Sequence, residues 1–244
     1  MSLPDLIAKG FDVQTVNHAA AVLIEDFPDP LAELCEVLAD VHIVDVELLR
    51  GGGGEAPFTQ RLRQSLTDRN WVKRNIVIRK TVDDIERATI SHEIDHVRRT
   101  DNGAIALEIE WNNKDPFFDR DLESFQRLHS EGAISVGVIV TRGQSMQRGM
   151  HDIVARCAMN HGVQDFDDLA PFDINPTPRQ RAMVKAKGAR FIQDWSRRFV
   201  QDKFGTATTH WSKLQERIAR GVGNPCPLLL VGLSETTISQ EKIQ

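Results

Sequence analysis

Cysteine is scarce in this chain, and it has no long apolar run. The three cysteines stand far apart, at positions 35, 157 and 226, so they indicate neither a disulfide framework nor the close cysteine pairs of a structural zinc site. No run approaches the ~18 apolar residues that a membrane span needs. The first twelve residues lack the apolar core of a signal peptide. We therefore expect a cytoplasmic protein that does not enter a membrane.

The composition is that of a globular protein, and its charge is unevenly distributed. Of 244 residues, 41% are hydrophobic and 27% are charged, with a net charge of −5. Residues 1–49 hold ten acids against one base, whereas residues 50–80 and 178–220 are strongly basic. The two basic tracts can form one electropositive face suited to nucleic acid, or they can be ordinary solvated helix faces.

Helices alternate along the chain with short buried strands. This pattern predicts an α/β fold with a central mixed β-sheet flanked by helices. We expect one domain over residues 1–244, in which residues 1–50 form an acidic helix and strand part and residues 51–235 form the core. Helices are predicted at 29–39, 58–70, 116–130, 147–160, 179–204 and 209–219, and strands at 41–49, 75–78, 133–140 and 228–233. The predicted inner face of the helix at 116–130 comprises Phe117, Leu122, Phe125 and Leu128.

An acidic β-hairpin between residues 90 and 111 is the most informative feature. Apolar and other residues alternate up to Glu108 and Glu110, which is typical of a strand with one apolar face. The two-residue turn falls either at Asn102-Gly103 or at Asp101-Asn102. The first register places Asp95 opposite Glu110 and the second places it opposite Glu108. In both registers the three carboxylates share one face of the hairpin.

Opposed carboxylates on one face repel each other unless a cation or a proton neutralises them. An oxygen-only ligand set suits a hard divalent ion, Mg²⁺ with Mn²⁺ as a substitute. In the alternative interpretation the acids face solvent and are balanced by Arg98, Arg99 and Lys114.

A second metal pattern overlaps the same hairpin. His92-Glu93-Ile94-Asp95-His96 matches the H-E-x-x-H motif of zinc proteases. On a helix, His92 and His96 would share a face, with Glu93 as the general base. A charged residue before the second histidine is unusual for this motif, and no third ligand stands out downstream. A zinc metalloprotease is therefore a minor alternative.

Several segments, in order along the chain, resemble the BglII/BstYI group of type II restriction endonucleases. Residues 71–76 match the group's Trp-x-x-x-Asn-Ile segment, and residues 94–95 match its metal-binding Ile-Asp. Residues 108–110 correspond to its catalytic Glu-Val-Gln, residues 138–143 to its Thr-Lys-Gly strand end, and residues 230–233 to its late Leu-Val-Gly-Leu strand.

The resemblance implies a PD-(D/E)xK nuclease fold, a homodimer and Mg²⁺-dependent hydrolysis of double-stranded DNA. It implies that Asp95 and Glu108 are carboxylate metal ligands, that the Ile109 carbonyl is a backbone ligand, and that Asn75 belongs to the active site. The residues that it implies for DNA contact are Asn112, Asn113, Lys114, Ser145, Gln147 and Arg148.

One departure from the group concerns Glu110, which stands where the group has glutamine and the superfamily has lysine. The related BamHI active site has an E-x-E arrangement, so catalysis is compatible with Glu110 as a base or a metal ligand. We expect a type II endonuclease that cuts a palindromic, GATC-centred six-base site. The alternatives are a nuclease of the same fold with another task, and a DNA-binding protein of this fold that does not cut.

Overall fold

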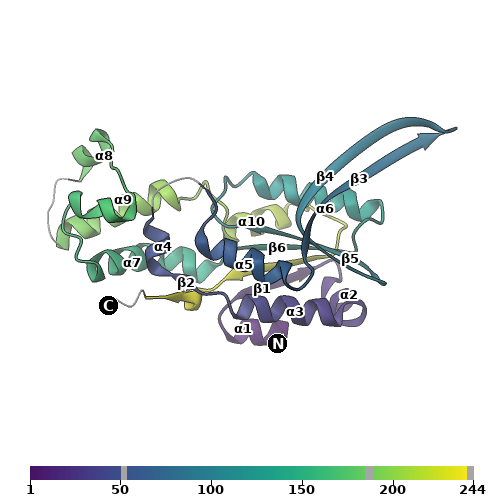
Figure 1. Ribbon diagram of the computed structural model, residues 1–244, viewed down its shortest axis with the longest axis horizontal. Helices are drawn as coiled ribbons and strands as arrows, with labels where there is room; N and C mark the ends of the chain where they lie inside the picture. Colours follow the sequence, from purple (N-terminus) through teal and green to yellow (C-terminus); the bar gives the residue numbers. More distant parts are fainter. Residues whose placement is uncertain (51–53, 185–188, 241–244) are drawn as a thin grey trace.

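The computed structural model describes residues 1–50, 54–184 and 189–240, and a six-stranded mixed sheet lies at its centre (Figure 1). The strand order is β1-β7-β6-β5-β4-β3. The three middle strands, β7, β6 and β5, are parallel, and the other pairs are antiparallel. The strands are β1 (Asp12–Val16), β3 (Val72–Val82), β4 (Ile85–Thr100), β5 (Gly103–Glu110), β6 (Val136–Arg142) and β7 (Leu228–Leu233). The predicted mixed α/β fold is confirmed.

Helices cover both faces of this sheet. One face packs on α6 (Phe117–Ser130) and α10 (Trp211–Ala219). The opposite face packs in a larger core on α1 (Leu3–Ala8), α2 (Ala19–Asp26), α3 (Pro28–Ala39), α4 (Asp45–Leu49), α5 (Pro57–Thr67), α7 (Gln144–Asn160) and α9 (Ala189–Lys203). The remaining elements are α8 (Pro178–Met183), η1 (Asp167–Phe172), η2 (Glu235–Thr237) and a short parallel pair, β2 (Ile43–Val44) with β8 (Ile238–Ser239).

Alternation along β5 assigns its side chains to the two faces. Ala104 and Ala106 belong to the α6 side, whereas Ile105 and Leu107 belong to the larger core. Successive side chains of a strand point to opposite faces, so Glu108 and Glu110 lie on the α6 side and Ile109 on the other.

The hairpin between β4 and β5 adopts one of the two predicted registers. Thr100 pairs with Gly103 and His96 pairs with Leu107, so Asp101-Asn102 is the two-residue turn. Continuing this register by one residue places Asp95 opposite Glu108.

The β3–β4 hairpin extends beyond the rest of the molecule as a two-stranded arm (Figure 1). Its tip is a two-residue turn at Asp83-Asp84, and both residues have positive φ, the conformation that suits the twist of a tight hairpin. Exposed apolar side chains line the outer part of the arm: Val77, Val82, Ile85 and Ile90.

Two predicted elements differ from the structure. In the strand predicted at 41–49, only Ile43–Val44 is extended, and Asp45 begins the helix α4. The region predicted as one helix at 179–204 holds two helices, α8 and α9, with residues 185–188 outside the described part of the chain. The run of four glycines at 51–54, which predicts a break between elements, also lies outside it, except for Gly54.

No helix in the described ranges has the length and apolar character needed to cross a membrane.

Candidate active site

Two buried glutamates mark the carboxyl end of β5. Glu108 is 5% exposed and Glu110 is 3% exposed. They lie beside the end of β6, because Glu108 pairs with Ile139 and Glu110 pairs with Thr141. The carboxyl ends of parallel strands are the usual place for ligand sites in α/β sheets.

An irregularity in β4 brings the main chain of Asp95 beside the Glu108 carboxylate, while the Asp95 carboxylate faces Arg63 of α5. Val72 pairs with Val97 and Arg74 pairs with Ile94, so two residues of β4, Asp95 and His96, lie opposite one residue of β3. A β-bulge of this kind changes the direction of a side chain next to a site. The backbone N–H of Asp95 donates a hydrogen bond of 3.4 Å to Oε1 of Glu108.

A fourth carboxylate, Asp121, comes from α6 and was missed by the sequence analysis. It is 3% exposed, and its Oδ1 accepts a hydrogen bond of 2.8 Å from Nε of Arg120. Phe118, Leu122 and Phe125 are buried on the same helix face. The sequence did contain a signal for Asp121, because it is an acidic residue at helical spacing among the apolar residues of this face. The predicted inner residue Phe117 instead packs against the Arg120 guanidinium, 4.3 Å from the ring centre.

We call Asp95, Glu108, Glu110 and Asp121 the acidic cluster. Burial, together with the negative charges of Asp121 and Asp95, raises the pKa of Glu108 to about 9. Burial and Asp121 also raise the pKa of Glu110, and burial raises that of Asp121. Each cause disfavours the ionised carboxylate, so the cluster is an electrostatically strained site that a cation would relieve.

Two neighbours hold Glu110 in place. Nδ2 of Asn113 donates a hydrogen bond of 2.7 Å to Oε2 of Glu110, and Nη2 of Arg120 lies 3.4 Å from Oε1. Arg120 is 58% exposed on its side chain, so its charge is partly screened by solvent. These contacts offset only part of the negative charge.

The donor set of the acidic cluster fits a hard divalent ion. All four side chains offer oxygen, and the buried Oδ2 of Asp121 has no hydrogen-bond partner. Glu110 and Asp121 lie close enough to interact, but no three of the four carboxylates have ligand atoms within 4.8 Å of one another. Within the described ranges, a group of three residues whose ligand atoms do lie within 4.8 Å of one another is found elsewhere. It consists of Asp45, Cys157 and His161.

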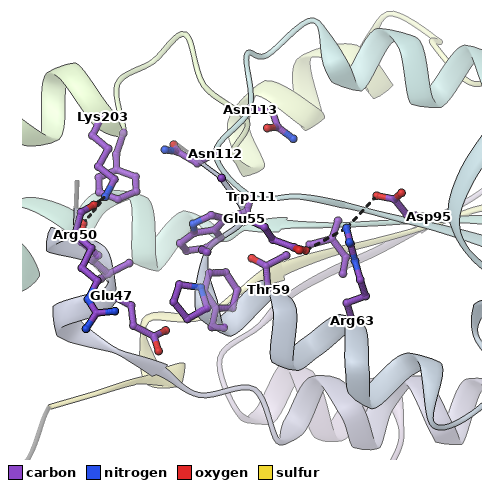
Figure 2. Close-up of a pocket in the computed structure, with 17 residues that line it drawn as sticks. Glu47, Arg50, Glu55, Thr59, Arg63, Asp95, Trp111, Asn112, Asn113 and Lys203 are labelled. Carbon is purple, nitrogen blue, oxygen red and sulfur yellow. Dashed lines mark hydrogen bonds and ion pairs between the residues drawn. The ribbon is translucent and has the colours of Figure 1, made fainter. Parts of the chain in front are cut away.

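A cleft of about 750 Å³ opens beside Asp95 (Figure 2). Figure 2 shows Arg63 of α5 pointing toward Asp95 and Glu55, with Nη2 3.8 Å from Oδ2 of Asp95 and 3.1 Å from Oε1 of Glu55. On the far side, Nζ of Lys203 donates a hydrogen bond of 2.5 Å to the Arg50 carbonyl. Arg63, Arg50 and Lys203 come from the two basic tracts, so these tracts do meet at one cleft.

Of the residues predicted to follow the catalytic strand, Asn112 and Asn113 line this cleft. Asn113 is committed to Glu110, and Oδ1 of Asn112 accepts a hydrogen bond of 2.9 Å from Nη1 of Arg142. Lys114 is exposed and pairs by its backbone with Thr208.

The three residues predicted to contact DNA at the start of α7 differ in how available their side chains are. Ser145 Oγ accepts a hydrogen bond of 3.2 Å from the Glu235 backbone N–H. Gln147 is held on both sides, by Arg142 Nε at 2.8 Å and through its Nε2 to the Phe204 carbonyl at 3.0 Å. Arg148 is exposed and is the most available of the three.

Arg142, which the sequence analysis passed over, is a fully buried arginine at the end of β6. It donates to Asn112, to the Trp111 carbonyl at 3.3 Å and to Thr208 Oγ1 at 2.8 Å, besides Gln147. Burial lowers its pKa to about 9. It thereby connects the segment after β5, which lines the cleft, with Gln147 and Thr208.

Asn75 lies on β3 opposite Glu93 and is exposed. The β3 residue that reaches the acidic cluster is Lys73, whose Nζ is 2.7 Å from Glu93 Oε1 and 4.0 Å from Asp95 Oδ1.

The zinc-protease arrangement is not present. His92 and His96 lie on the strand β4, where residues four apart are separated by about 13 Å. Nδ1 of His92 is 3.2 Å from Ser124 Oγ of α6, and His96 pairs with Leu107 of β5. The helical geometry that the H-E-x-x-H motif requires is therefore absent from this segment.

Comparison with known proteins gives a clear result at the family level. A search of the curated proteins finds no match. A family model described as "Restriction endonuclease BglII/BglIII" matches residues 11–233, which includes every strand of the central sheet and the acidic cluster. The chain therefore belongs to the BglII/BglIII family of type II restriction endonucleases, site-specific deoxyribonucleases that bind double-stranded DNA and hydrolyse it.

Proposed function

We propose that the acidic cluster is the catalytic centre of this restriction endonuclease and that it works with a divalent metal, Mg²⁺ or Mn²⁺, in a PD-(D/E)xK type of core. The observation that carries the proposal is the burial of Glu108 and Glu110 at the end of β5, opposite Asp95. Buried carboxylates with raised pKa values are characteristic of functional sites.

Asp95, Glu108 and the Ile109 carbonyl are the proposed metal ligands. The bound ion would polarise the scissile phosphate and lower the pKa of a coordinated water. Asp121, buried beside Glu110, is an added candidate ligand or an outer residue that orients one.

Glu110 is the proposed group that orients or deprotonates the attacking water, or that binds a second ion. Asn113 and Arg120 fix its carboxylate through the two contacts described above, so it is held in one orientation. Lys73 and Arg63, both near Asp95, are suited to contact the phosphate backbone. Asn75 is proposed to bind the surrounding water.

Base reading is proposed for residues beside the cleft. Asn and Gln pair bidentately with adenine, and Arg with guanine. Arg148, Lys114 and Ser145 have side chains that a duplex could reach with little change, whereas Asn112 and Gln147 would have to exchange their bonds with Arg142. The proposed target is a palindromic six-base site centred on GATC.

A homodimer is the proposed working form, because a palindrome that is cut in both strands calls for two active sites related by a two-fold axis. The exposed apolar side chains of the β3–β4 arm, Val77, Val82, Ile85 and Ile90, are a surface that a second copy could cover. We propose one endonuclease domain over residues 1–244 that works in the cytoplasm. Its core contains Leu6 and Leu34 as well as Leu229.

Digestion of phage DNA by the full-length protein tests the proposal. With Mg²⁺ we expect discrete fragments, and with EDTA none. A smear would show a nuclease without site preference. A gel shift without any cutting would instead establish a DNA-binding protein that has lost the chemistry.

A further inference from the structure

A second group of potential metal ligands lies away from the acidic cluster. Cys157 and His161 are near the carboxyl end of α7, and Asp45 is the first residue of α4. One ligand atom from each lies within 4.8 Å of the others. Cys157 belongs to the larger core, whereas Glu108 and Glu110 lie on the α6 side of the sheet, so the two groups are on opposite faces.

The three residues are brought together by simple local geometry. Positions four apart on a helix share a face, which places Cys157 and His161 side by side. The helices α4 and α7 pack against each other, and this contact adds Asp45. The His161 ring is held by an edge contact with Phe172, at 5.4 Å between ring centres. Asp45 and Cys157 are both almost completely buried.

The chemistry of this set points to zinc. Sulfur, imidazole nitrogen and carboxylate oxygen are the three kinds of Zn²⁺ ligand, and a thiolate selects against Mg²⁺ and Ca²⁺. In a tetrahedral zinc site the ligand atoms are about 3.3–3.6 Å apart. The ligand atoms of Asp45, Cys157 and His161, which lie within 4.8 Å of one another, therefore need to move only slightly closer together to bind the ion. Asp45 also lines a cavity of about 250 Å³, together with Arg156 and Glu235.

We propose that Asp45, Cys157 and His161 bind Zn²⁺ and that the ion joins the start of α4 to the end of α7. The site is structural in effect. Glu47 and Leu48 of α4 line the cleft beside Asp95, so zinc would brace one wall of that cleft without taking part in the cleavage chemistry.

Cobalt substitution of the full-length protein is the test. The chelator-treated protein is titrated with Co²⁺, and thiolate-to-cobalt charge-transfer absorption is followed. We expect this absorption in the wild type, and we expect Zn²⁺ to displace Co²⁺ and to raise the thermal unfolding midpoint. Excess Mg²⁺ should displace neither ion, because it binds thiolate poorly.

Variants identify the ligands. Cys157→Ser and His161→Gln should each weaken zinc binding by at least the 10–100-fold that loss of an outer-shell partner costs. Cys35→Ser, which removes another buried cysteine of the same core, is the matched control and should retain the absorption. Glu108→Ala, which removes a proposed catalytic ligand, should retain it as well.

The wild-type protein decides the outcome even if a variant fails to fold. Absence of the charge-transfer absorption, together with an unfolding midpoint that Zn²⁺ leaves unchanged, would overturn the proposal and identify the three residues as a hydrogen-bonded group. Loss of the absorption in Cys35→Ser but not in Cys157→Ser would overturn it too.

Discussion

The backbone N–H of Asp95 is hydrogen-bonded to Oε1 of Glu108 across the β4–β5 hairpin. The β-bulge in β4 makes this contact possible, because it brings the Asp95 main chain over the end of β5. The side chain of one proposed metal ligand, Glu108, is thus positioned by the backbone of another, Asp95.

Glu108→Gln keeps the shape of the side chain and removes its charge. We expect cleavage of a DNA substrate to fall by about 100-fold or more, the size of effect seen when one key electrostatic group is lost from an active site. DNA binding in a gel shift should persist. Glu123→Gln on α6, which changes an exposed glutamate, is the control. Full cleavage by Glu108→Gln would remove Glu108 from the site.

The same Glu108→Gln change should stabilise the metal-free protein. Burial and neighbouring carboxylates disfavour ionised Glu108, and a neutral amide escapes that cost. We expect a gain of about 1 kcal/mol or more, which is about 2–4 °C in Tm for a chain of this size. Calorimetry with EDTA and then with Mg²⁺ measures both states. The wild type should gain Tm from the ion, and the variant should gain less. A lower metal-free Tm in the variant would contradict the strained-site interpretation.

Asp121→Asn tests the carboxylate that the structure added. If Asp121 belongs to the metal environment, the variant should need about 10–100-fold more Mg²⁺ for half-maximal cleavage, and Glu123→Gln should behave like the wild type. Titration of Mg²⁺ in a cleavage assay measures the difference. An unchanged metal requirement would make Asp121 only a packing neighbour of Glu110.

His210, the residue before α10, should make stability fall in acid. Burial, Arg142 and Lys213 lower the pKa of this histidine to about 4, and neither ring nitrogen has a hydrogen-bond partner. Glu216 and Asp115 oppose this shift only in part. Between pH 6.5 and about 4 the unfolded chain therefore binds a proton that the folded chain does not, so stability decreases as the pH falls.

Urea unfolding of wild type and His210→Gln at pH 7 and at pH 4.5 isolates this contribution. The loss of unfolding free energy between the two pH values should be smaller in the variant. Equal losses would show that His210 is protonated in the folded protein.

Arg148→Ala should weaken DNA binding through one lost phosphate or base contact. If Arg148 contacts a phosphate, the slope of log K against log salt should decrease by about 1. If it contacts guanine, discrimination against one base pair should relax instead, by about 1–3 kcal/mol. Lys9→Ala in the acidic N-terminal part is the control. Binding that stays unchanged in both affinity and specificity would place Arg148 outside the interface.

The hairpin and most of the sheet could be predicted because their signals are local. Alternation along β5 and the turn residues at 101–103 limit the hairpin to two registers, and only the packed sheet selects the one that places Asp95 opposite Glu108. The β-bulge at Asp95 has no sequence signal of its own, since it depends on how β3 pairs. The strand predicted at 41–49 fails because Asp45 begins a helix there.

The site residues that sequence analysis missed come together from segments that are far apart in the sequence. Asp121 approaches Glu110 only after α6 packs on the sheet, although its place in an apolar helix stripe was visible. Cys157 and His161 have the spacing of helix ligands, but Asp45 joins them from more than a hundred residues earlier. The roles of Asp95, Glu108, Glu110, Asn75 and the DNA-contact residues stay predictions until they are tested.

Arg142 gives the cleft an additional property. One buried guanidinium is bonded at the same time to the segment after β5, to Gln147 and to Thr208, so none of these segments can shift without disturbing the others. A displacement of Asn112 would therefore also act, through this one side chain, on the Trp111 carbonyl. If Asn112 has the base-reading role proposed for it, Arg142 would couple that base contact to the segment that directly follows Glu110.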